Sequence, residues 1–161
     1  MWIILIVFLM SLLIIGYLTY LYLDIQAEKT IDFSNTKERV LAETNITNIE
    51  TIERYHEKEY YHIVYGFADD HTEYIVFVPQ SGEYDMTVVQ VDDIINEEAI
   101  MAQWEKTCQA CTFIRLTPAL LEDEVLWEIT YVNDTDKYIF EYYTINDGQL
   151  YEQIKLLKIF K

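Results

Sequence analysis

The feature that most constrains this chain is a run of 22 residues without a charged side chain, from Trp2 to Leu23. A helix rises 1.5 Å per residue, so this run would reach roughly 33 Å, enough to cross a hydrocarbon core of about 30 Å. All of the Asp, Glu, Lys and Arg residues come after it. The run therefore predicts one transmembrane helix over residues 1–23, followed by a body on one side of the membrane.

A cleaved secretory signal and a buried core helix are the alternatives to a retained anchor. A secretory signal has a basic start, an apolar stretch of about 7–15 residues and a small-residue cleavage site. Here no Lys or Arg precedes the run, the run is longer, and Ala27 offers only a poor cleavage site. Core helices rarely carry so long an uncharged stretch. Aromatic residues typical of membrane interfaces stand at the two ends: Trp2, then Tyr17, Tyr20 and Tyr22.

The charges beside the run do not fix its orientation. Cytoplasmic flanks carry an excess of Lys and Arg. No basic residue precedes the run, and Lys29, Lys37 and Arg39 follow it among several acidic residues. Taken literally, this small excess favours a cytoplasmic body. We treat the charge pattern as indecisive.

The body, Asp24 to Lys161, is strongly acidic. It contains all 28 acidic and 11 basic residues and so carries the formal charge of −17. Such a body repels phosphate backbones and has no basic stripe, which excludes nucleic acid as a partner class. Lys155, Lys158 and Lys161 near the C-terminus are typical of an exposed edge strand, where Lys discourages aggregation.

Alternating apolar residues, 14 Tyr and 7 Phe predict an α+β fold dominated by sheet. A helix is expected over residues 27–44, at least from Asn35. A second helix is expected from an N-cap at Asp92 or Asp93 to about Lys106. The expected strands are 48–55, 59–68, 72–78 and 86–91, then 112–118, 125–132, 138–144 and 149–159.

The order of one helix and four strands occurs twice, with a period of about 65 residues. The matched positions are Asp69 with Asp134, Tyr74 with Tyr138, and Gly82 with Gly148. We therefore predict two small tandem modules, each with one helix packed on an antiparallel sheet. The expected division is a transmembrane helix over 1–23, a juxtamembrane linker or helix extension over 24–34, a first module over 35–91 and a second over 92–161.

Cys108 and Cys111 form a C-x-x-C pair, the one motif in the sequence that is typical of redox or metal chemistry. Redox-active pairs stand where a helix begins, since the helix N-terminus stabilises the thiolate. This pair follows the end of a predicted helix, and two cysteines do not complete a zinc site. Inert thiols, an incidental local disulfide, a structural disulfide and a redox pair remain open, with the inert or incidental interpretation favoured.

No other cluster predicts chemistry. The three histidines are expected at the surface or in hairpins, and nothing in their spacing suggests a catalytic triad. The acidic groups are expected to be solvated loop residues, and Asp134-x-Asp136 lacks the Gly and the Glu of a calcium loop. We predict no catalytic, cofactor-binding or metal-ligating residue and no small-molecule substrate. The residues considered are His56, His62, His71, Asp69, Asp70, Glu122, Asp123, Glu124, Asp134, Asp136 and the sequons at Asn45 and Asn133.

Several strand segments together resemble a known family. They are Ile52 to Gly66 (I-E-R-Y-H-E-K-E-Y-Y-H-I-V-Y-G), Thr72 to Pro79 (T-E-Y-I-V-F-V-P), Val125 to Tyr131 (V-L-W-E-I-T-Y), Tyr138 to Thr144 and the turn at Gly148. Placed after an N-terminal span and a short helix, they resemble the TseB-like cell-wall elongation regulators of Gram-positive bacteria. The body of that family consists of two tandem PepSY-like (cystatin-like) modules.

The resemblance implies a non-enzymatic protein without a cofactor. It implies a single-pass protein of the cell membrane, anchored in the lipid bilayer through Trp2–Leu23, with its body outside the cell. It also implies regulation of wall elongation by binding a penicillin-binding protein. Because PepSY modules also occur in propeptides, an extracellular protease inhibitor is the alternative, with Glu122-Asp123-Glu124 as its most protruding segment. An enzyme with an unrecognised site is the third and least favoured hypothesis.

Overall fold

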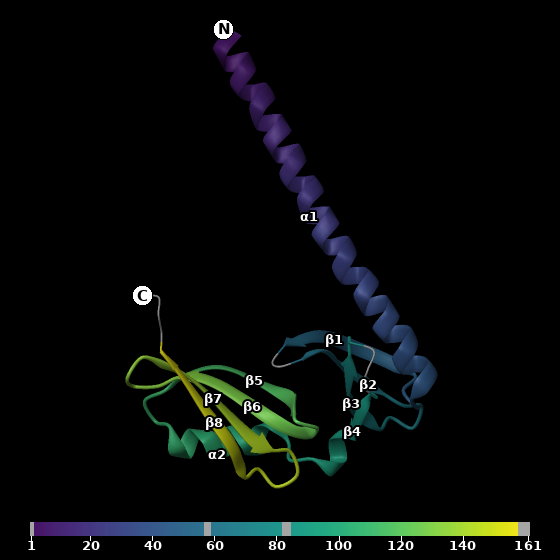
Figure 1. Ribbon diagram of the computed structural model, residues 1–161, viewed down its shortest axis with the longest axis vertical. Coiled ribbons are helices and arrows are strands. Elements are labelled where there is room, and N and C mark those ends of the chain that lie inside the picture. Colours follow the sequence, from purple (N-terminus) through teal and green to yellow (C-terminus); the bar gives the residue numbers. More distant parts are fainter. Residues whose placement is uncertain (1, 57–58, 82–84, 158–161) are drawn as a thin grey trace. The chain divides into compact units, whose positions relative to one another are not determined.

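The computed structural model of the chain describes residues 2–56, 59–81 and 85–157, with the helical backbone but not the side chains of residues 3–5, 7 and 24–31. It divides into two compact units, Met1–Glu43 and Thr44–Lys161. The first unit is helical. The second holds eight described strands and a helix (Figure 1).

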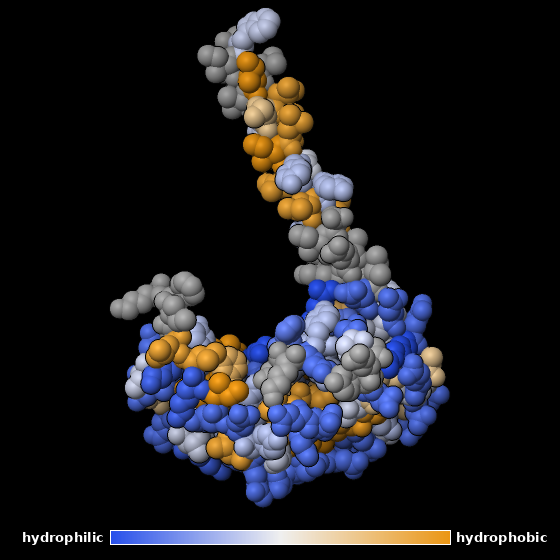
Figure 2. Space-filling view, in the orientation of Figure 1, coloured by the Kyte–Doolittle hydropathy of each residue, from blue (hydrophilic) through white to orange (hydrophobic). Residues whose placement is uncertain are grey.

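The first unit is one helix, α1 (Trp2–Glu43), of 42 residues. It continues without a break through residues 24–34, where a linker or a helix extension was expected. Ser11 and Thr19 donate their hydroxyls to the carbonyls of Phe8 and Ile15, at 2.8 and 2.9 Å, so neither hydroxyl interrupts the helix. Figure 2 shows apolar side chains exposed along this part of α1. None of the described helical stretches combines the length and the apolar character that a membrane crossing requires.

The second unit contains two four-stranded antiparallel sheets, each a simple meander (Figure 1). The first sheet is β1 (Asn48–His56), β2 (Tyr60–Phe67), β3 (Glu73–Pro79) and β4 (Thr87–Gln90). A 3₁₀ turn, η1 (Val91–Asp93), and helix α2 (Glu97–Thr107) follow it. The second sheet is β5 (Thr112–Leu121), β6 (Glu124–Val132), β7 (Lys137–Thr144) and β8 (Leu150–Leu157). The predicted α+β class and the two tandem modules are thus confirmed.

Helix α2 begins later than the sequence predicted. Its N-cap is Asn96, whose side-chain oxygen accepts a hydrogen bond from the backbone N–H of Ala99 at 2.9 Å. Asp92 and Asp93, the predicted caps, instead lie in η1. The prediction of Asp92 or Asp93 as the cap was therefore wrong; an amide oxygen caps a helix as well as a carboxylate does, so Asn96 serves equally.

Matching irregularities show how closely the two sheets correspond. A bulge interrupts β1 between Ile49 and Thr51, and another interrupts β5 between Phe113 and Arg115. The β2–β3 and β6–β7 loops also close alike. The backbone N–H of Ala68 donates to the carbonyl of Thr72 at 3.0 Å, and Asn133 donates to Lys137 at 3.0 Å. The offsets of 64 and 65 residues agree with the predicted period.

Of the three matched pairs of positions, the tyrosine pair is offset by one residue, and the glycine pair is described only at Gly148. Tyr74 pairs with Gly66, the second pair from its loop, whereas Tyr138 pairs with Val132, the first pair from its loop. The prediction that these tyrosines correspond was therefore wrong by one residue. Gly148 lies in the β7–β8 turn at a φ of 66°, which favours glycine. Gly82, its predicted counterpart, lies outside the described residues.

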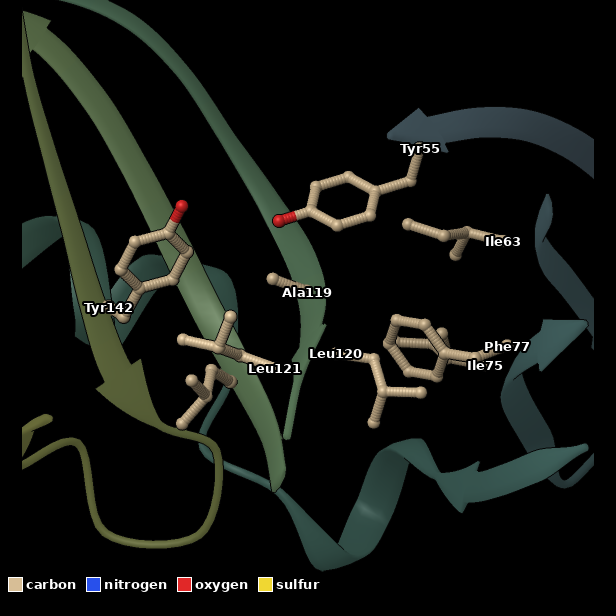
Figure 3. Close-up of a cluster of buried hydrophobic side chains, with 9 residues drawn as sticks. Tyr55, Ile63, Ile75, Phe77, Ala119, Leu120, Leu121 and Tyr142 are labelled. Atoms are coloured by element: carbon tan, nitrogen blue, oxygen red, sulfur yellow. The ribbon is translucent and has the colours of Figure 1, made fainter. Parts of the chain in front are cut away.

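The second unit has two hydrophobic clusters. One lies under α2 and contains Ile100, Trp104, Trp127 and Ile129. The other joins the two sheets, and Figure 3 shows side chains of each sheet pointing toward those of the other. It contains Tyr55, Ile63, Ile75 and Phe77 from the first sheet, and Ala119, Leu120, Leu121, Leu126 and Tyr142 from the second. The two modules therefore share a core.

Candidate interaction surface

A cavity of about 460 Å³ lies where the first sheet, the connection into α2 and the second sheet meet. We call it the junction cavity. Its apolar lining consists of Tyr65, Ile75, Val91, Ile94 and Trp127. Its polar lining is Asn96 together with three carboxylates: Glu73, Glu97 and Glu98.

Local hydrogen bonds fix the connection that forms one wall. The indole Nε1 of Trp127 donates to the carbonyl of Ile95 at 2.9 Å. The backbone N–H of Ile95 in turn donates to the carbonyl of Ile145 at 2.8 Å. These two bonds hold the connection to the second sheet. The Asn96 cap then starts α2, which places Glu97 in its first turn.

The junction cavity has an acidic electrostatic character. Burial, then the negative charges of Glu53 and Glu97, raise the pKa of Tyr65 well above its usual value, so its phenol stays neutral. Glu97 and Glu98 also offset the partial positive charge of the α2 N-terminus. The cavity therefore offers aromatic and aliphatic surface together with negative charge.

A buried carboxylate, Glu128, lies between the two sheets. Its side chain is 2% exposed. Tyr55 donates its hydroxyl to one carboxylate oxygen at 2.8 Å, and Arg115 and Thr130 donate to the other at 2.7 and 3.0 Å. Glu128 is thus a polar tie between β1 of the first sheet and β6 of the second. Alternation along β6 places Glu128 and Thr130 on one face, but the sequence does not indicate that this face is buried.

A second buried carboxylate, Glu141, lies on the same side of the second sheet as α2. Tyr131 and Tyr143 donate their hydroxyls to its two oxygens at 2.9 and 2.6 Å, and Gln153 also donates to it. Burial, then the hydrogen bond and charge of Glu141, raise the pKa of both tyrosines well above the usual value. These neutral donors satisfy the carboxylate, an arrangement that stabilises structure rather than one poised for catalysis.

The two cysteines are joined. Cys108 and Cys111 form a disulfide with a Cα–Cα distance of 5.5 Å. Cys108 is the C-cap of α2, so the pair lies at the negative end of the helix, as the sequence predicted. Of the interpretations left open, free inert thiols do not hold in this structure.

The three histidines do not form one group, although His56 and His62 both lie beside the ring of Tyr60. His62 is fully buried in β2, which corrects the prediction that all three are surface or hairpin residues. Its Nε2 lies 3.2 Å from the hydroxyl of Tyr60. His71 lies in the β2–β3 loop, stacked on Phe67, and His56 ends β1. Alternation in β2 already placed His62 on the face of Val64, but did not show that this face is closed.

The acidic loops have structural roles. Glu122 and Asp123 form a two-residue turn between β5 and β6, both with positive φ. Asp70 accepts a hydrogen bond from the backbone N–H of Thr72, and this bond holds the pKa of Asp70 below its usual range. Asn133 accepts bonds from Thr135 and Lys137 and so closes the β6–β7 loop. No described group of three or more His, Cys, Asp or Glu residues could hold a metal ion.

Residues 35–79 match the family model of the cell wall elongation regulator TseB-like domain. The match covers the end of α1 and the strands β1 to β3. No curated protein matches the chain. The family resemblance predicted from the strand segments is thereby confirmed.

Two solved structures are similar. The YpmB protein from Bacillus subtilis matches with a TM-score of 0.70 and 20% identity, over 75% of this chain and 94% of that protein. A lipoprotein from Clostridium difficile 630 matches with a TM-score of 0.39 and 11% identity, over 80% of this chain and 91% of that one. The first similarity shows that the two proteins share a fold. The second is too low to carry an argument.

Proposed function

The chain carries a TseB-like domain, and from this premise we propose that it regulates cell-wall elongation by binding a penicillin-binding protein. The proposal includes a single-pass anchor through Trp2–Leu23 and a body outside the cell. In this proposal the protein acts by recruiting its partner and catalyses no reaction of its own. The observation that carries the proposal is the family match over residues 35–79.

The anchor is supported by the sequence and by the exposure of α1. Its 22 uncharged residues are long enough as a helix to cross a hydrocarbon core. The described apolar side chains between Ile6 and Leu23 are exposed, which is costly in water and favourable in lipid. An anchored body would reach only partners at the same membrane, such as the synthases of the lateral wall.

The chemistry of the body favours binding over catalysis, because its buried polar groups serve the structure. Its buried carboxylates, Glu128 and Glu141, are satisfied by hydrogen bonds, and its buried histidine contacts a tyrosine. The protease-inhibitor alternative relied on Glu122-Asp123-Glu124 as a protruding wedge. That hairpin is a two-residue turn, which gives the alternative no support.

The proposal is tested by topology and by cross-linking. External protease applied to intact cells should remove an epitope placed at the C-terminus, while a cytoplasmic marker survives. Cross-linking before membrane extraction should join the protein to a band that fluorescent penicillin labels. The control replaces residues 2–23 with an unrelated single span, which should keep the cross-link if the body does the binding. A protected epitope, or no penicillin-labelled partner, would contradict the proposal.

A further inference from the structure

Two residues that line the junction cavity, Ile75 and Trp127, also belong to the hydrophobic clusters. The lining as a whole has the features of a binding site. Apolar surface and two aromatic rings, Tyr65 and Trp127, line it together with polar groups that converge from separate elements. Its volume of about 460 Å³ lies in the range of ligand-binding pockets, about 300–1,000 Å³. Its wall is held by the Trp127 bond to Ile95, so the cavity does not depend on a mobile loop.

The negative charge of the lining favours a ligand with positive charge. Glu73 comes from the start of β3, whereas Glu97 and Glu98 come from the first turn of α2. Among the residues that the structure describes, no Lys, Arg or His lines the cavity. The three carboxylates are exposed, and like charges gathered around a concave site raise the local concentration of the opposite charge. An anion at the α2 N-terminus would face these carboxylates, so the cavity favours a cation.

The aromatic lining narrows the choice of cation. Tyr65 is half-buried and presents part of its ring to the cavity, whereas Trp127 is 2% exposed and closed to direct stacking. An aromatic ring attracts cationic groups, and a planar guanidinium both stacks on it and pairs with carboxylates through two hydrogen bonds. A lysine ammonium is more strongly hydrated and gains less from the apolar lining. Arginine therefore fits the lining better than lysine does.

We propose that the junction cavity receives an arginine side chain from an exposed basic segment of a partner protein. The charge complementarity between this segment and the acidic lining provides the attraction, and the apolar lining accommodates the aliphatic part of the side chain. The inference deepens the proposed function because it names the surface on which the partner docks. Attraction of this kind weakens with salt.

Binding is tested with the full chain in detergent micelles and a blocked five-residue peptide that contains two arginines. The readout is the indole N–H signal of Trp127 in a two-dimensional NMR spectrum. We expect a saturable shift of this signal that weakens with added salt. The matched peptide with neutral citrulline in place of arginine should bind at least tenfold more weakly, and the lysine peptide should fall between the two. Equal binding of the citrulline peptide would overturn the proposal.

A set of matched variants locates the site. Replacing the three lining carboxylates with glutamine, Glu73→Gln, Glu97→Gln and Glu98→Gln, should weaken arginine-peptide binding at least tenfold. The control makes the same change of net charge at exposed residues outside the cavity: Glu105→Gln, Glu124→Gln and Glu152→Gln. An equal loss in both triple variants would mean a general charge effect and would overturn the proposal. Dispersed indole signals in each variant show that it remains folded.

The same variants separate this inference from the proposed function. If cells yield a penicillin-labelled cross-link that the lining variant does not reduce, the proposed function stands and the junction cavity is not the docking surface. If the purified protein binds the arginine peptide at the cavity but no penicillin-labelled partner is found, the inference stands and the partner belongs to another class.

Discussion

Replacing Tyr55 with phenylalanine removes a hydroxyl of the first sheet that donates to the buried carboxylate of Glu128. The hydrogen bond is 2.8 Å long and its acceptor is 2% exposed. A hydrogen bond to a charged group contributes about 1.5–3 kcal/mol. Because Arg115 and Thr130 still donate to Glu128, the carboxylate is not left bare. We therefore expect Tyr55→Phe to lower the free energy of unfolding by about 1.5–3 kcal/mol.

The measurement is urea unfolding of the full chain in detergent micelles, followed by tryptophan fluorescence. Tyr151→Phe is the matched control because it removes the same hydroxyl from an exposed position on β8. It should change the free energy of unfolding by no more than about 0.5 kcal/mol. If Tyr55→Phe costs no more than this control, the hydrogen bond does not stabilise the contact between the sheets and the reasoning is refuted.

A double-mutant cycle isolates the pair itself. Glu128→Gln keeps the shape of the side chain but removes the charge that strengthens the bond from Tyr55. The loss from Tyr55→Phe should therefore be smaller in the Glu128→Gln background than in the native chain. Contacting residues commonly show a coupling of about 0.5–3 kcal/mol, and we expect at least about 1 kcal/mol here. Additive effects would show that each residue acts through other contacts.

Three further predictions concern the second module. Trp127→Phe should lower the free energy of unfolding by about 1 kcal/mol more than Trp104→Phe, measured by urea unfolding. The reason is that the indole of Trp127 is hydrogen-bonded, while the buried Nε1 of Trp104 has no partner among the described residues. Equal losses would contradict this. Tyr131 and Tyr143 have raised pKa values, so below about pH 10 they leave stability unchanged. Above it the unfolded chain ionises first, and the free energy of unfolding should fall as pH rises, less so in the double Phe variant; an unchanged slope would refute this. Replacing the Glu122-Asp123 turn with Asn-Gly should raise the free energy of unfolding by about 0.5–1 kcal/mol, because both residues have positive φ. The gain should appear as a higher midpoint in thermal unfolding, and no gain would mean that the turn is unstrained.

The strand pattern was predictable because alternation is a local property. Val125 to Val132 shows why: Trp127, Ile129 and Tyr131 share one face in the sequence and lie in one cluster under α2 in the structure. The order of the elements followed from the same signal. The helix cap was less predictable, because Asp92, Asp93 and Asn96 are all residue types that cap helices, and each would start the helix at a different position.

Burial of the β6 face that carries Glu128 was not predictable, since it depends on contact between two modules that are far apart in sequence. Tyr55 and Glu128 are separated by 73 positions. A Glu on a strand is ordinarily read as solvent-exposed. The junction cavity was missed for the same reason, because its lining extends from Tyr65 to Trp127 and comes together only when the sheets meet.

The two modules have the same fold but different interiors, and this difference explains how they are joined. Counting from their loops, Glu128 occupies the position of Ile63, and Glu141 occupies that of Val76. Ile63 and Val76 are 1% and 0% exposed, so the first module has an apolar side chain at each position where the second has a buried acid. A buried acid is tolerated only with donors, and Glu128 takes one of them, Tyr55, from the first module. The second module therefore depends on the first to satisfy its interior, so the tandem copies form one body and are not interchangeable.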